Sequence, residues 1–351
     1  MKILQAITLA DLGGAQSVLI NLSNKAVEDG HDVYVVSEEN GAMWDLLSPK
    51  VRKIKVKELQ RSISPVNDFK AYLALKKIYR QIKPDVIHLH SSKIGALGRL
   101  AFPKEKIIFT VHGFDSVRLA NPKFLIIEKL LKSRVKKIVA VSEYDKVILK
   151  EEGIDKSVVT IYNGIQDIDA DKKLSPTVDF ETLRKDYKIV MCIARLSPQK
   201  KFDLFCEIAE KMRGEKLKFV WIGNKEDVKP VSDNIMMLGE ISDAKDYLRY
   251  ADLFILPSNY EGLPISIIES LAYRKPVIAS NVGGVSEILN GTNGFALEND
   301  ADLFVEKIKH VLMDEVRYEQ FCANARDTYE SHFTIDQMYD SYISLYKETN
   351  H

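Results

Sequence analysis

The chain has 351 residues, of which 46% are hydrophobic and 28% charged, and its 50 Lys and Arg are balanced by 50 Asp and Glu. This length exceeds what one hydrophobic core usually supports, so we expect two domains. No apolar run approaches the ~18 to 20 residues of a membrane-spanning helix, so we do not expect a transmembrane protein. Three cysteines, Cys192, Cys206 and Cys322, lack metal-binding spacing, so we expect a cytoplasmic protein with neither a disulfide framework nor a zinc site.

The charge is unevenly distributed along the chain. Residues 1–166 carry 27 Lys and Arg against 18 Asp and Glu, a net charge of +9, whereas residues 167–351 carry 23 against 32, a net charge of −9. A nucleic-acid-binding protein would need one dominant basic surface, so this distribution argues against a nucleic-acid partner. A basic first half is compatible with contact to an anionic surface.

The first half of the chain alternates strand-like and helix-like segments. The strand-like runs are, in chain order, ILQAITL, DVYVVS, DVIHLH, KIIFTVH, KIVAVS and VVTIY. Amphipathic stretches of helical length lie between several of them, at residues 15–29 and 69–82. Alternation of this kind is typical of βαβ units with a parallel sheet.

The second half repeats this plan after a polar segment. The segment YNGIQDIDADKKLSPTVDF has few large apolar residues and predicts a linker, with a domain boundary near Gly164. The strand-like runs IVMCIA, KFVWIG, DLFILPS and KPVIAS follow, with amphipathic stretches at 202–212 and 302–313. From Asp300 onward the pattern is almost wholly helical, and the final FTIDQMYDSYISLYKETN needs a hydrophobic partner, which could be the first domain.

The fold class predicted from this pattern is α/β. We expect two doubly wound domains, residues 1–164 and residues 165–330, and a C-terminal helix, residues 331–351, that crosses back to pack on the first domain.

A glycine pair follows the first predicted strand. Gly13 and Gly14 precede a helix whose N-terminal amides could hold a negatively charged oxygen. The pattern is not G-x-G-x-x-G, and the next strand does not end on an acidic residue, although Glu38 and Glu39 lie near it, which argues against a dinucleotide site. A tight strand-to-helix turn without a ligand is the alternative.

Two cations follow the first strand of the second half, in the sequence IARLSPQKKFDLF. Arg195 supplies planar, forked donors and Lys200 a mobile point charge, so together they could neutralise a nucleoside diphosphate leaving group without a metal ion. A solvated basic loop is the alternative.

The stretch SNYEGLPISIIESLAYR places two glutamates around a Gly-Leu-Pro break. Glu261 lies in a loop after a buried strand, where Gly262 and Pro264 let the backbone approach a ligand, and the helix that follows has a second anion-binding N-terminus. Glu269 lies more than a turn into that helix on an apolar face, where a carboxylate needs a partner. The two glutamates are interpreted as acceptors from sugar and ribose hydroxyls rather than as a paired acid and base.

In the order and spacing of its short motifs, the chain resembles the large retaining glycosyltransferase family of the GT-B fold often called GT4. This family includes many bacterial cell-surface polysaccharide enzymes. The resemblance covers nearly the whole length. It depends on the ordered set LGGAQ, FTVHGFD, AVSEY, IYNGI, ARLSPQK, WIGN, EGLPISIIE and KPVIASNVGGVSEIL. It implies two Rossmann-like domains, the first binding the acceptor and the second a nucleotide-sugar donor.

The resemblance also implies roles for individual residues. It places Arg195 and Lys200 on the donor diphosphate, Glu269 on the donor ribose, and Glu261 on the donor sugar. The amides of Gly262 and Leu263 would assist Glu261. From the first domain, Gly14 would lie against the diphosphate or acceptor, and His112 would approach the reacting sugar. A histidine at a strand end could equally be a satisfied structural residue. His88 is interpreted as structural, and His90 is left open.

The mechanism implied by the resemblance needs no cofactor and no metal ion. The acceptor hydroxyl would attack the face that the diphosphate leaves, with both substrates positioned across an interdomain cleft. An Asp-x-Asp pattern occurs in DIDAD, from Asp167 to Asp171, but it falls in the linker. One position departs from the family pattern: the residue after Lys200 is usually Gly and here is Lys201, which puts details of the phosphate contacts in doubt.

Donor and acceptor are only partly specified. We expect a hexose or N-acetylhexosamine from a nucleotide sugar, with UDP favoured by family frequency, and a glycan or lipid-linked acceptor. One alternative is another GT-B enzyme such as a phosphorylase, or an epimerase. Another is a non-catalytic nucleotide-sugar-binding partner subunit.

A basic, apolar segment of the first half could meet a membrane. NPKFLIIEKLLKSRVKK interleaves apolar residues with basic ones, and KVRKIKVKELQR adds a second basic run. One interpretation is a peripheral helix on anionic lipid at the inner face of the cell membrane. The other is an amphipathic helix packed on the sheet with a solvated Lys face. The basic residues concerned are Lys123, Lys129, Lys132, Arg134, Lys136 and Lys137.

Overall fold

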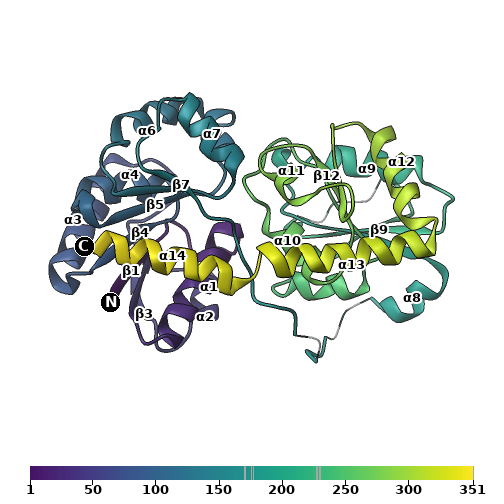
Figure 1. The fold of residues 1–351 in the computed structure, drawn as a ribbon, viewed down its shortest axis with the longest axis horizontal. Helices are drawn as coiled ribbons and strands as arrows, with labels where there is room; N and C mark the ends of the chain where they lie inside the picture. The colour runs from purple at the N-terminus through teal and green to yellow at the C-terminus, as the bar shows by residue number, and fades with distance from the viewer. Residues whose placement is uncertain (170, 175, 177, 227, 229–230, 351) are drawn as a thin grey trace. The chain divides into compact units, whose positions relative to one another are not determined.

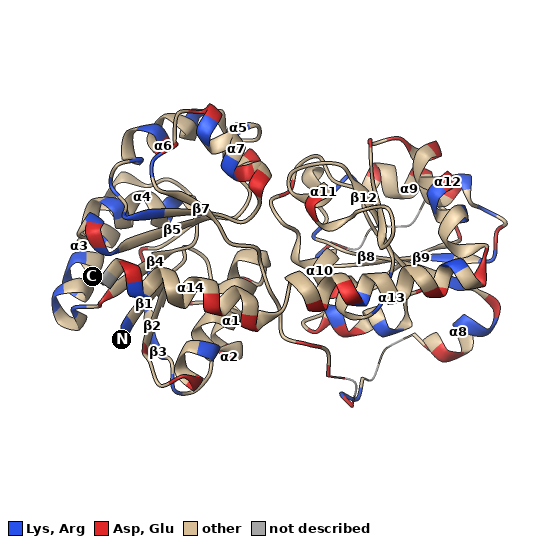
Figure 2. Ribbon diagram, in the orientation of Figure 1, with Lys and Arg blue, Asp and Glu red and all other residues tan. Residues whose placement is uncertain are grey.

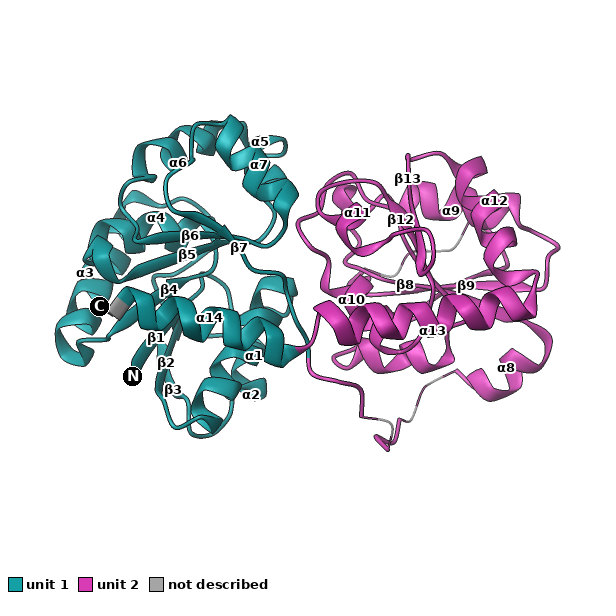
Figure 3. Cartoon of the chain, viewed as in Figure 1, with its two compact units in different colours: residues 1–165, 335–351 teal, residues 166–334 magenta. Residues whose placement is uncertain are grey.

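Two units, each built on one parallel sheet, make up the chain. The structure is a computed structural model that describes residues 1–169, 171–174, 176, 178–226, 228 and 231–350. Unit 1 comprises residues 1–165 and 335–351, and unit 2 comprises residues 166–334 (Figure 3). All described strand pairs are parallel, which confirms the predicted α/β class.

The sheet of unit 1 has seven strands in the order β3-β2-β1-β4-β5-β6-β7. Its inner strands are rich in Val, Ile and Leu and are buried on both faces, as parallel sheets covered by helices require. The strands are β1 (Lys2–Ala6), β2 (Asp32–Ser37), β3 (Arg52–Lys55), β4 (Val86–Leu89), β5 (Ile107–Val111), β6 (Lys137–Ala140) and β7 (Val158–Thr160).

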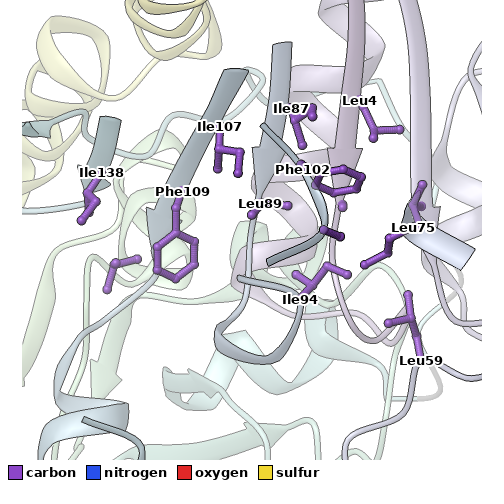
Figure 4. Packing of buried hydrophobic residues seen from close by; sticks show 14 of the residues in the cluster. Leu4, Leu59, Leu75, Ile87, Leu89, Ile94, Phe102, Ile107, Phe109 and Ile138 are labelled. Atoms are coloured by element: carbon purple, nitrogen blue, oxygen red, sulfur yellow. The ribbon is translucent and has the colours of Figure 1, made fainter. Parts of the chain in front are cut away.

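The helices of unit 1 connect these strands (Figure 1). They are α1 (Gly14–Glu28), α2 (Met43–Leu46), α3 (Pro65–Ile82), α4 (Ser92–Ala101), α5 (Asp115–Arg118), α6 (Leu125–Leu131) and α7 (Glu143–Glu151), with short 3₁₀ turns η1 (Lys104–Lys106) and η2 (Pro122–Phe124). Because crossovers between parallel strands are right-handed, connections that run in opposite directions from the centre of the sheet cover opposite faces. On one face α4 contacts α3 and α6, and a cluster of buried side chains lies beneath them, including Leu4, Ile87, Leu89, Ile94 and Phe109 (Figure 4).

The sheet of unit 2 has six strands in the order β10-β9-β8-β11-β12-β13. The strands are β8 (Lys188–Ile193), β9 (Leu217–Ile222), β10 (Ile235–Met237), β11 (Leu253–Leu256), β12 (Val277–Ser280) and β13 (Gly294–Leu297). The helices and 3₁₀ turns are α8 (Phe180–Asp186), η3 (Pro198–Lys200), α9 (Phe202–Lys211), η4 (Ala244–Tyr250), α10 (Ile265–Ala272), α11 (Val285–Ile288), α12 (Ala301–Leu312) and α13 (Glu315–His332).

The last helix, α14 (Ile335–Asn350), belongs to unit 1. It contacts α1 and β4, and it buries Met338, Tyr342 and Tyr346 there. The Gly164 amide lies 3.1 Å from the Met338 sulfur, which fixes the start of the helix beside the end of the first segment of unit 1. These apolar and aromatic residues account for the helical spacing in the final sequence segment.

The run KVRKIKVKELQR, interpreted from the sequence as a basic run, contains β3. Arg52, Lys53 and Lys55 are the charged residues of this four-residue edge strand, and its pairing with β2 is parallel. Charged side chains on an edge strand discourage pairing with another chain, so their presence is compatible with a strand at this position.

None of the helices in the described part of the chain is both long enough and apolar enough to cross a membrane.

Candidate active site

In unit 2 the sheet order reverses between β8 and β11. The chain adds β9 and β10 on one side of β8 and places β11, β12 and β13 on the other. Ligands of open parallel sheets bind at such a point, beyond the carboxyl ends of the strands. The segments that leave these two ends are residues 194–201 and 257–264, and they carry Arg195, Lys200 and Glu261. Three residues selected from the sequence thus lie where this fold binds its ligands.

Hydrogen bonds to backbone carbonyls tie the two segments to each other. The Asn259 amide donates to the Gln199 carbonyl at 2.8 Å, and the Gln199 side-chain amide donates to the Tyr260 carbonyl at 2.8 Å. Because these hydrogen bonds hold the backbone on both sides, they set the positions of the neighbouring Lys200 and Glu261 relative to each other.

Lys200 and Glu261 form an ion pair. The Lys200 ammonium donates to Glu261 Oε1, and their side chains are only 14% and 7% exposed. The Ser258 hydroxyl donates to the same oxygen at 2.6 Å. Among the described residues, Glu261 Oε2 has no hydrogen-bond partner. The carboxylate is therefore held through one oxygen and presents the other as an acceptor.

Ser258 is itself held by Ser280, at the end of β12, and by Asn299, which follows β13. Its amide donates to the Ser280 hydroxyl oxygen at 2.7 Å, and its carbonyl accepts from the Asn299 side-chain amide at 3.0 Å. The Ser280 hydroxyl donates to Asn299 Oδ1 at 2.5 Å, which closes a triangle of hydrogen bonds. Ser258, Ser280 and Asn299 were not selected from the sequence, where they are short polar residues without a distinguishing pattern.

A glycine after β12 allows close contact with the Glu261 loop. Gly283 has φ +58°, and a Cβ atom at this position would lie 2.1 Å from the Glu261 carbonyl oxygen. The Gly284 amide donates to the Gly262 carbonyl at 2.8 Å. Leu263, which follows Gly262, is 4% exposed. Pro264 is the N-cap residue of α10 and makes no side-chain hydrogen bond to it. The N-terminal amides of α10 are thus not capped by a side chain, and its first turn holds no acidic residue.

Arg195 and Lys201 lie on the same segment as Lys200. Arg195 is exposed, and among the described residues its guanidinium makes no hydrogen bond or ion pair. Lys201 has φ +40°, in the left-handed region, and precedes the first residue of α9. This conformation explains why glycine is usual at that position in the family that the chain resembles.

Glu269 lies in the fifth position of α10 and is partly buried. Its carboxylate forms no hydrogen bond or ion pair with any described residue. The expectation that it would have a partner is therefore not met by the residues described. Burial raises the pKa of Glu269 to about 7, with the nearby Lys245 acting in the opposite direction. A carboxylate that has no partner among the described residues, and whose pKa is near neutral, is suited to binding a ligand that donates hydrogen bonds.

In unit 1 the strand order reverses between β1 and β4. The segment after β1 leads to Gly13, in extended backbone, and to Gly14, the first residue of α1, which has no side-chain cap and no acidic residue in its first turn. Thr8 and Ser91, which follow β1 and β4, share a 2.8 Å hydrogen bond between their hydroxyls. The glycine turn predicted from the sequence thus opens a helix at the carboxyl edge of this sheet.

His112 follows β5 at the same edge of the unit 1 sheet. It is partly buried, and its Nε2 lies 3.2 Å from Nδ1 of His90, which is fully buried. Burial lowers the pKa of His112 to about 4, so the ring is neutral at physiological pH. His88, interpreted as structural, is also fully buried and hydrogen-bonded through both ring nitrogens.

Three observations on the described residues concern metal binding and other hollows. No three His, Cys, Asp or Glu side chains within it are grouped in a way that could hold a metal ion. Asp167, from the Asp-x-Asp pattern, accepts two 2.6 Å hydrogen bonds from Arg326. A hollow of about 310 Å³ between α11 and α13 is lined by Glu287, Asn324 and His332 among others, and none of the site residues named above lines it.

Comparison with known proteins now identifies the family. Residues 12–167 match the family model described as Glycosyltransferase Family 4, and residues 177–328 match the model described as Glycosyl transferases group 1. The chain belongs to the GT4-like family of GT-B glycosyltransferases.

Two curated relatives of this family span nearly the whole chain. The Escherichia coli UDP-Gal:alpha-D-GlcNAc-diphosphoundecaprenol alpha-1,3-galactosyltransferase is 27% identical over 95% of this chain and 94% of its own length. The O-antigen biosynthesis glycosyltransferase WbnH of Escherichia coli is 27% identical over 97% of both chains. Among solved structures, Anabaena HepE in complex with UDP-glucose superimposes with a TM-score of 0.81 over 99% of this chain and 100% of that one, at 19% identity, which shows the shared fold.

Proposed function

We propose that this GT4-like glycosyltransferase transfers a hexose or N-acetylhexosamine, with retention and without a metal ion, from a UDP-sugar to a glycan or lipid-linked acceptor in the assembly of a cell-surface polysaccharide. The names of its relatives support this proposal, because one uses UDP-galactose and a diphosphoundecaprenol-linked acceptor and another acts in O-antigen biosynthesis. Two structural neighbours are complexes with UDP and glucose or with UDP-glucose.

The observation that carries the proposal is the arrangement of Lys200, Glu261 and Arg195 at the point of strand reversal in unit 2. A lysine ammonium has three donors, and the ion pair with Glu261 uses one of them. The other two donors, with the exposed fork of Arg195, would bind the diphosphate and stabilise the charge that develops as it leaves. Two cations would then do what a metal ion does in other phosphate sites.

The two glutamates would bind the sugar and the nucleoside. Glu261 Oε2 would accept from a hydroxyl of the donor sugar, assisted by the amides of Gly262 and Leu263 near the start of α10. Because Lys200 neutralises the carboxylate and Ser258 also donates to Oε1, Glu261 would be a poor nucleophile and a well-placed acceptor. Glu269 would accept from the ribose diol, a role that suits a carboxylate without a protein partner.

The residues of unit 1 would serve the acceptor and the reacting sugar. Gly14 opens α1, whose uncapped amides would bind an anionic oxygen, and His112 would contact the sugar as a neutral ring. Transfer with retention would follow from attack of the acceptor hydroxyl on the face from which the diphosphate departs. Catalysis of this kind depends on positioning and on charge stabilisation rather than on a protein nucleophile.

Thermal-shift measurements with UDP, GDP, ADP, dTDP, CMP and NAD would test the donor site. A ligand at ~100 times its dissociation constant should stabilise the protein by ~2.7 kcal/mol. We expect a shift with UDP that is lost in Glu269→Ala and kept in Glu207→Ala, a matched control on the exposed side of α9. A shift with NAD alone, or with none of the ligands, would contradict the proposal.

A transfer assay with the purified chain would test catalysis. Transfer by the single chain would exclude a non-catalytic partner subunit, and activity unchanged by a chelator would support metal independence. Activity lost to the chelator and restored by manganese would overturn the metal-free part of the proposal.

We also propose that the α6 surface docks on anionic lipid, which would bring the enzyme to a lipid-linked acceptor. This surface comprises the exposed apolar side chains Leu119, Ile126, Ile127 and Leu130 and the basic residues Lys123, Lys129, Lys132, Arg134, Lys136 and Lys137.

The orientation of α6 supports this proposal. Glu128 is buried and accepts from Arg99 at 2.6 Å, so the helix directs its acidic residue inward. Leu125 packs against the core of unit 1, but Ile126 and Leu130 are 62% and 72% exposed, so part of the apolar surface of α6 is left uncovered by the described residues. Figure 2 shows Lys and Arg on α6 and its neighbours. Exposed apolar side chains rimmed by cations suit an anionic membrane surface.

Sedimentation with liposomes would test the α6 surface. We expect binding to anionic vesicles, reduced by salt, and no binding to neutral vesicles. The double variant Ile126→Glu and Leu130→Glu should lose binding, whereas Val316→Glu, which changes an 84% exposed residue of unit 2, should keep it. No binding of the unaltered protein at physiological salt would remove the proposal.

A further inference from the structure

Seven side chains of unit 1 form one unbroken chain of hydrogen bonds. It connects α14 to His112, and six of its seven members are fully or almost fully buried, while His112 at its end is partly exposed. In order, the members and distances are His112 Nε2 to His90 Nδ1 (3.2 Å), His90 Nε2 to Gln5 Oε1 (2.6 Å), Gln5 Nε2 to Tyr346 Oη (3.2 Å), Tyr346 Oη to His88 Nδ1 (2.6 Å), His88 Nε2 to Thr110 Oγ1 (2.6 Å) and Thr110 Oγ1 to Tyr342 Oη (3.0 Å).

This chain of hydrogen bonds joins residues that are far apart in the sequence. Gln5 lies on β1, His88 near the end of β4, and Thr110 on β5, whereas Tyr342 and Tyr346 lie on α14. A buried polar group without a partner is costly, so each member depends on the next for its hydrogen bonds. The order of donors and acceptors at one link therefore fixes the order at the others.

The amide of Gln5 sets the direction of the bonds. Its Nε2 can only donate, so the Tyr346 oxygen accepts from Gln5, and the Tyr346 hydroxyl hydrogen is directed to His88 Nδ1. Its Oε1 can only accept, so His90 donates from Nε2. Burial lowers the pKa of His90 well below its ordinary value, so the ring is neutral and its Nδ1 carries a lone pair. His112 must then donate to His90 from Nε2.

We propose that Gln5, His90 and Tyr346 are positioning residues that hold His112 in the tautomer protonated at Nε2, so that its Nδ1 accepts a hydrogen bond from a hydroxyl of the reacting sugar. This inference deepens the role proposed for His112 and rests on the proposed function. Nδ1 of His112 has no hydrogen-bond partner among the described residues and is therefore available to a ligand. A ring whose pKa is about 4 accepts a hydrogen bond without taking up the proton, so His112 orients the hydroxyl rather than acting as a general base.

A rotated Gln5 amide would reverse every link. Tyr346 would then donate to Oε1, His90 would carry its proton on Nδ1, and His112 would be protonated at Nδ1 and present a donor instead. The tautomer of His112 is thus a direct readout of the direction of the whole chain.

Nitrogen-15 NMR of the histidine rings in the intact protein measures this tautomer without a substrate. We expect His112 and His90 both neutral and protonated at Nε2 in the unaltered protein. Tyr346→Phe removes the acceptor of the Gln5 amide and should give mixed tautomers at His112. Tyr342→Phe is the matched control, because it removes the same hydroxyl from an equally buried tyrosine of α14 at the far end of the chain, beyond Thr110.

Kinetics supply the second measurement. For Tyr346→Phe we expect kcat to fall about tenfold while KM for the donor changes less than about twofold, and for Tyr342→Phe we expect both to remain near those of the unaltered enzyme. Protonation of His112 at Nδ1 in the unaltered protein would overturn the inference. So would a folded Tyr346→Phe variant with an unchanged His112 tautomer and kcat. An inactive protein with the expected tautomer would support the positioning chain and contradict only the proposed function.

Discussion

We predict that the raised pKa of Glu269 makes donor affinity dependent on pH. If the ribose diol hydrogen-bonds to the carboxylate form, only ionised Glu269 binds it well, and burial holds the pKa of the free protein at about 7. The ionised fraction then falls from about ten-elevenths at pH 8 to about one-eleventh at pH 6. We therefore expect the dissociation constant for a UDP-sugar to rise about tenfold between these pH values, equivalent to about 1.4 kcal/mol.

Isothermal titration calorimetry with a UDP-sugar would measure this change. The diphosphate of a UDP-sugar is esterified at both ends and lacks the second ionisation that a phosphate monoester shows near pH 6, so the ligand contributes no slope. Binding should also release about half a proton at pH 7, seen as a dependence of the heat on the buffer. Glu269→Gln is the control, and its affinity should not vary with pH.

Two results would refute this reasoning. Affinity that stays constant between pH 6 and pH 8 in the unaltered protein would show that the charge of Glu269 does not matter to the donor. An equal slope in Glu269→Gln would assign the pH dependence to another group.

Three further predictions concern stability. The pKa of Glu269 is above its ordinary value of 4.5, so ionisation of this carboxyl group destabilises the fold. Glu269→Gln should therefore have a higher Tm than the unaltered protein at pH 8, and the difference in Tm should vanish below about pH 4.5. Lys201→Gly should raise Tm slightly, because the left-handed conformation costs about 1 kcal/mol, whereas Lys201→Ala should not, and equal Tm values for the two variants would contradict this cause. Gly283→Ala should lower Tm and donor affinity more than Gly291→Ala, because both glycines have positive φ but only Gly283 lies against the Glu261 backbone. Equal losses in the two variants would show that the contact between Gly283 and Glu261 is unimportant.

The sequence predicted the elements whose pattern is local. Runs of Val, Ile and Leu identified the inner strands of both sheets, and amphipathic periodicity identified α1, α3, α9 and α12 close to their observed bounds. β3 was not predicted, because its residues Arg52–Lys55 are mostly basic and an edge strand needs little apolar surface. β10 and β13 were also not predicted, since IMM has one β-branched residue and GFAL has none.

The candidate site was only partly predictable for a different reason. Motifs selected Lys200 and Glu261 separately, one for phosphate and one for sugar, yet the structure pairs them with each other. Similarly, the periodicity of α6 could not show that Glu128 turns inward, because its partner Arg99 lies on another helix. Gln5 and Tyr346 are 341 positions apart, so their hydrogen bond has no local signal.

The place of α14 in unit 1 has a consequence for how the protein is made. Unit 2 is a continuous segment, residues 166–334, so it can fold on the ribosome as soon as it emerges. Unit 1 emerges earlier, but until residues 335–350 are synthesised Gln5 lacks Tyr346 and His88 lacks one of its two partners. We therefore expect the usual order of co-translational folding to be inverted, with the first-made sheet completed last and exposed to chaperones in the interval.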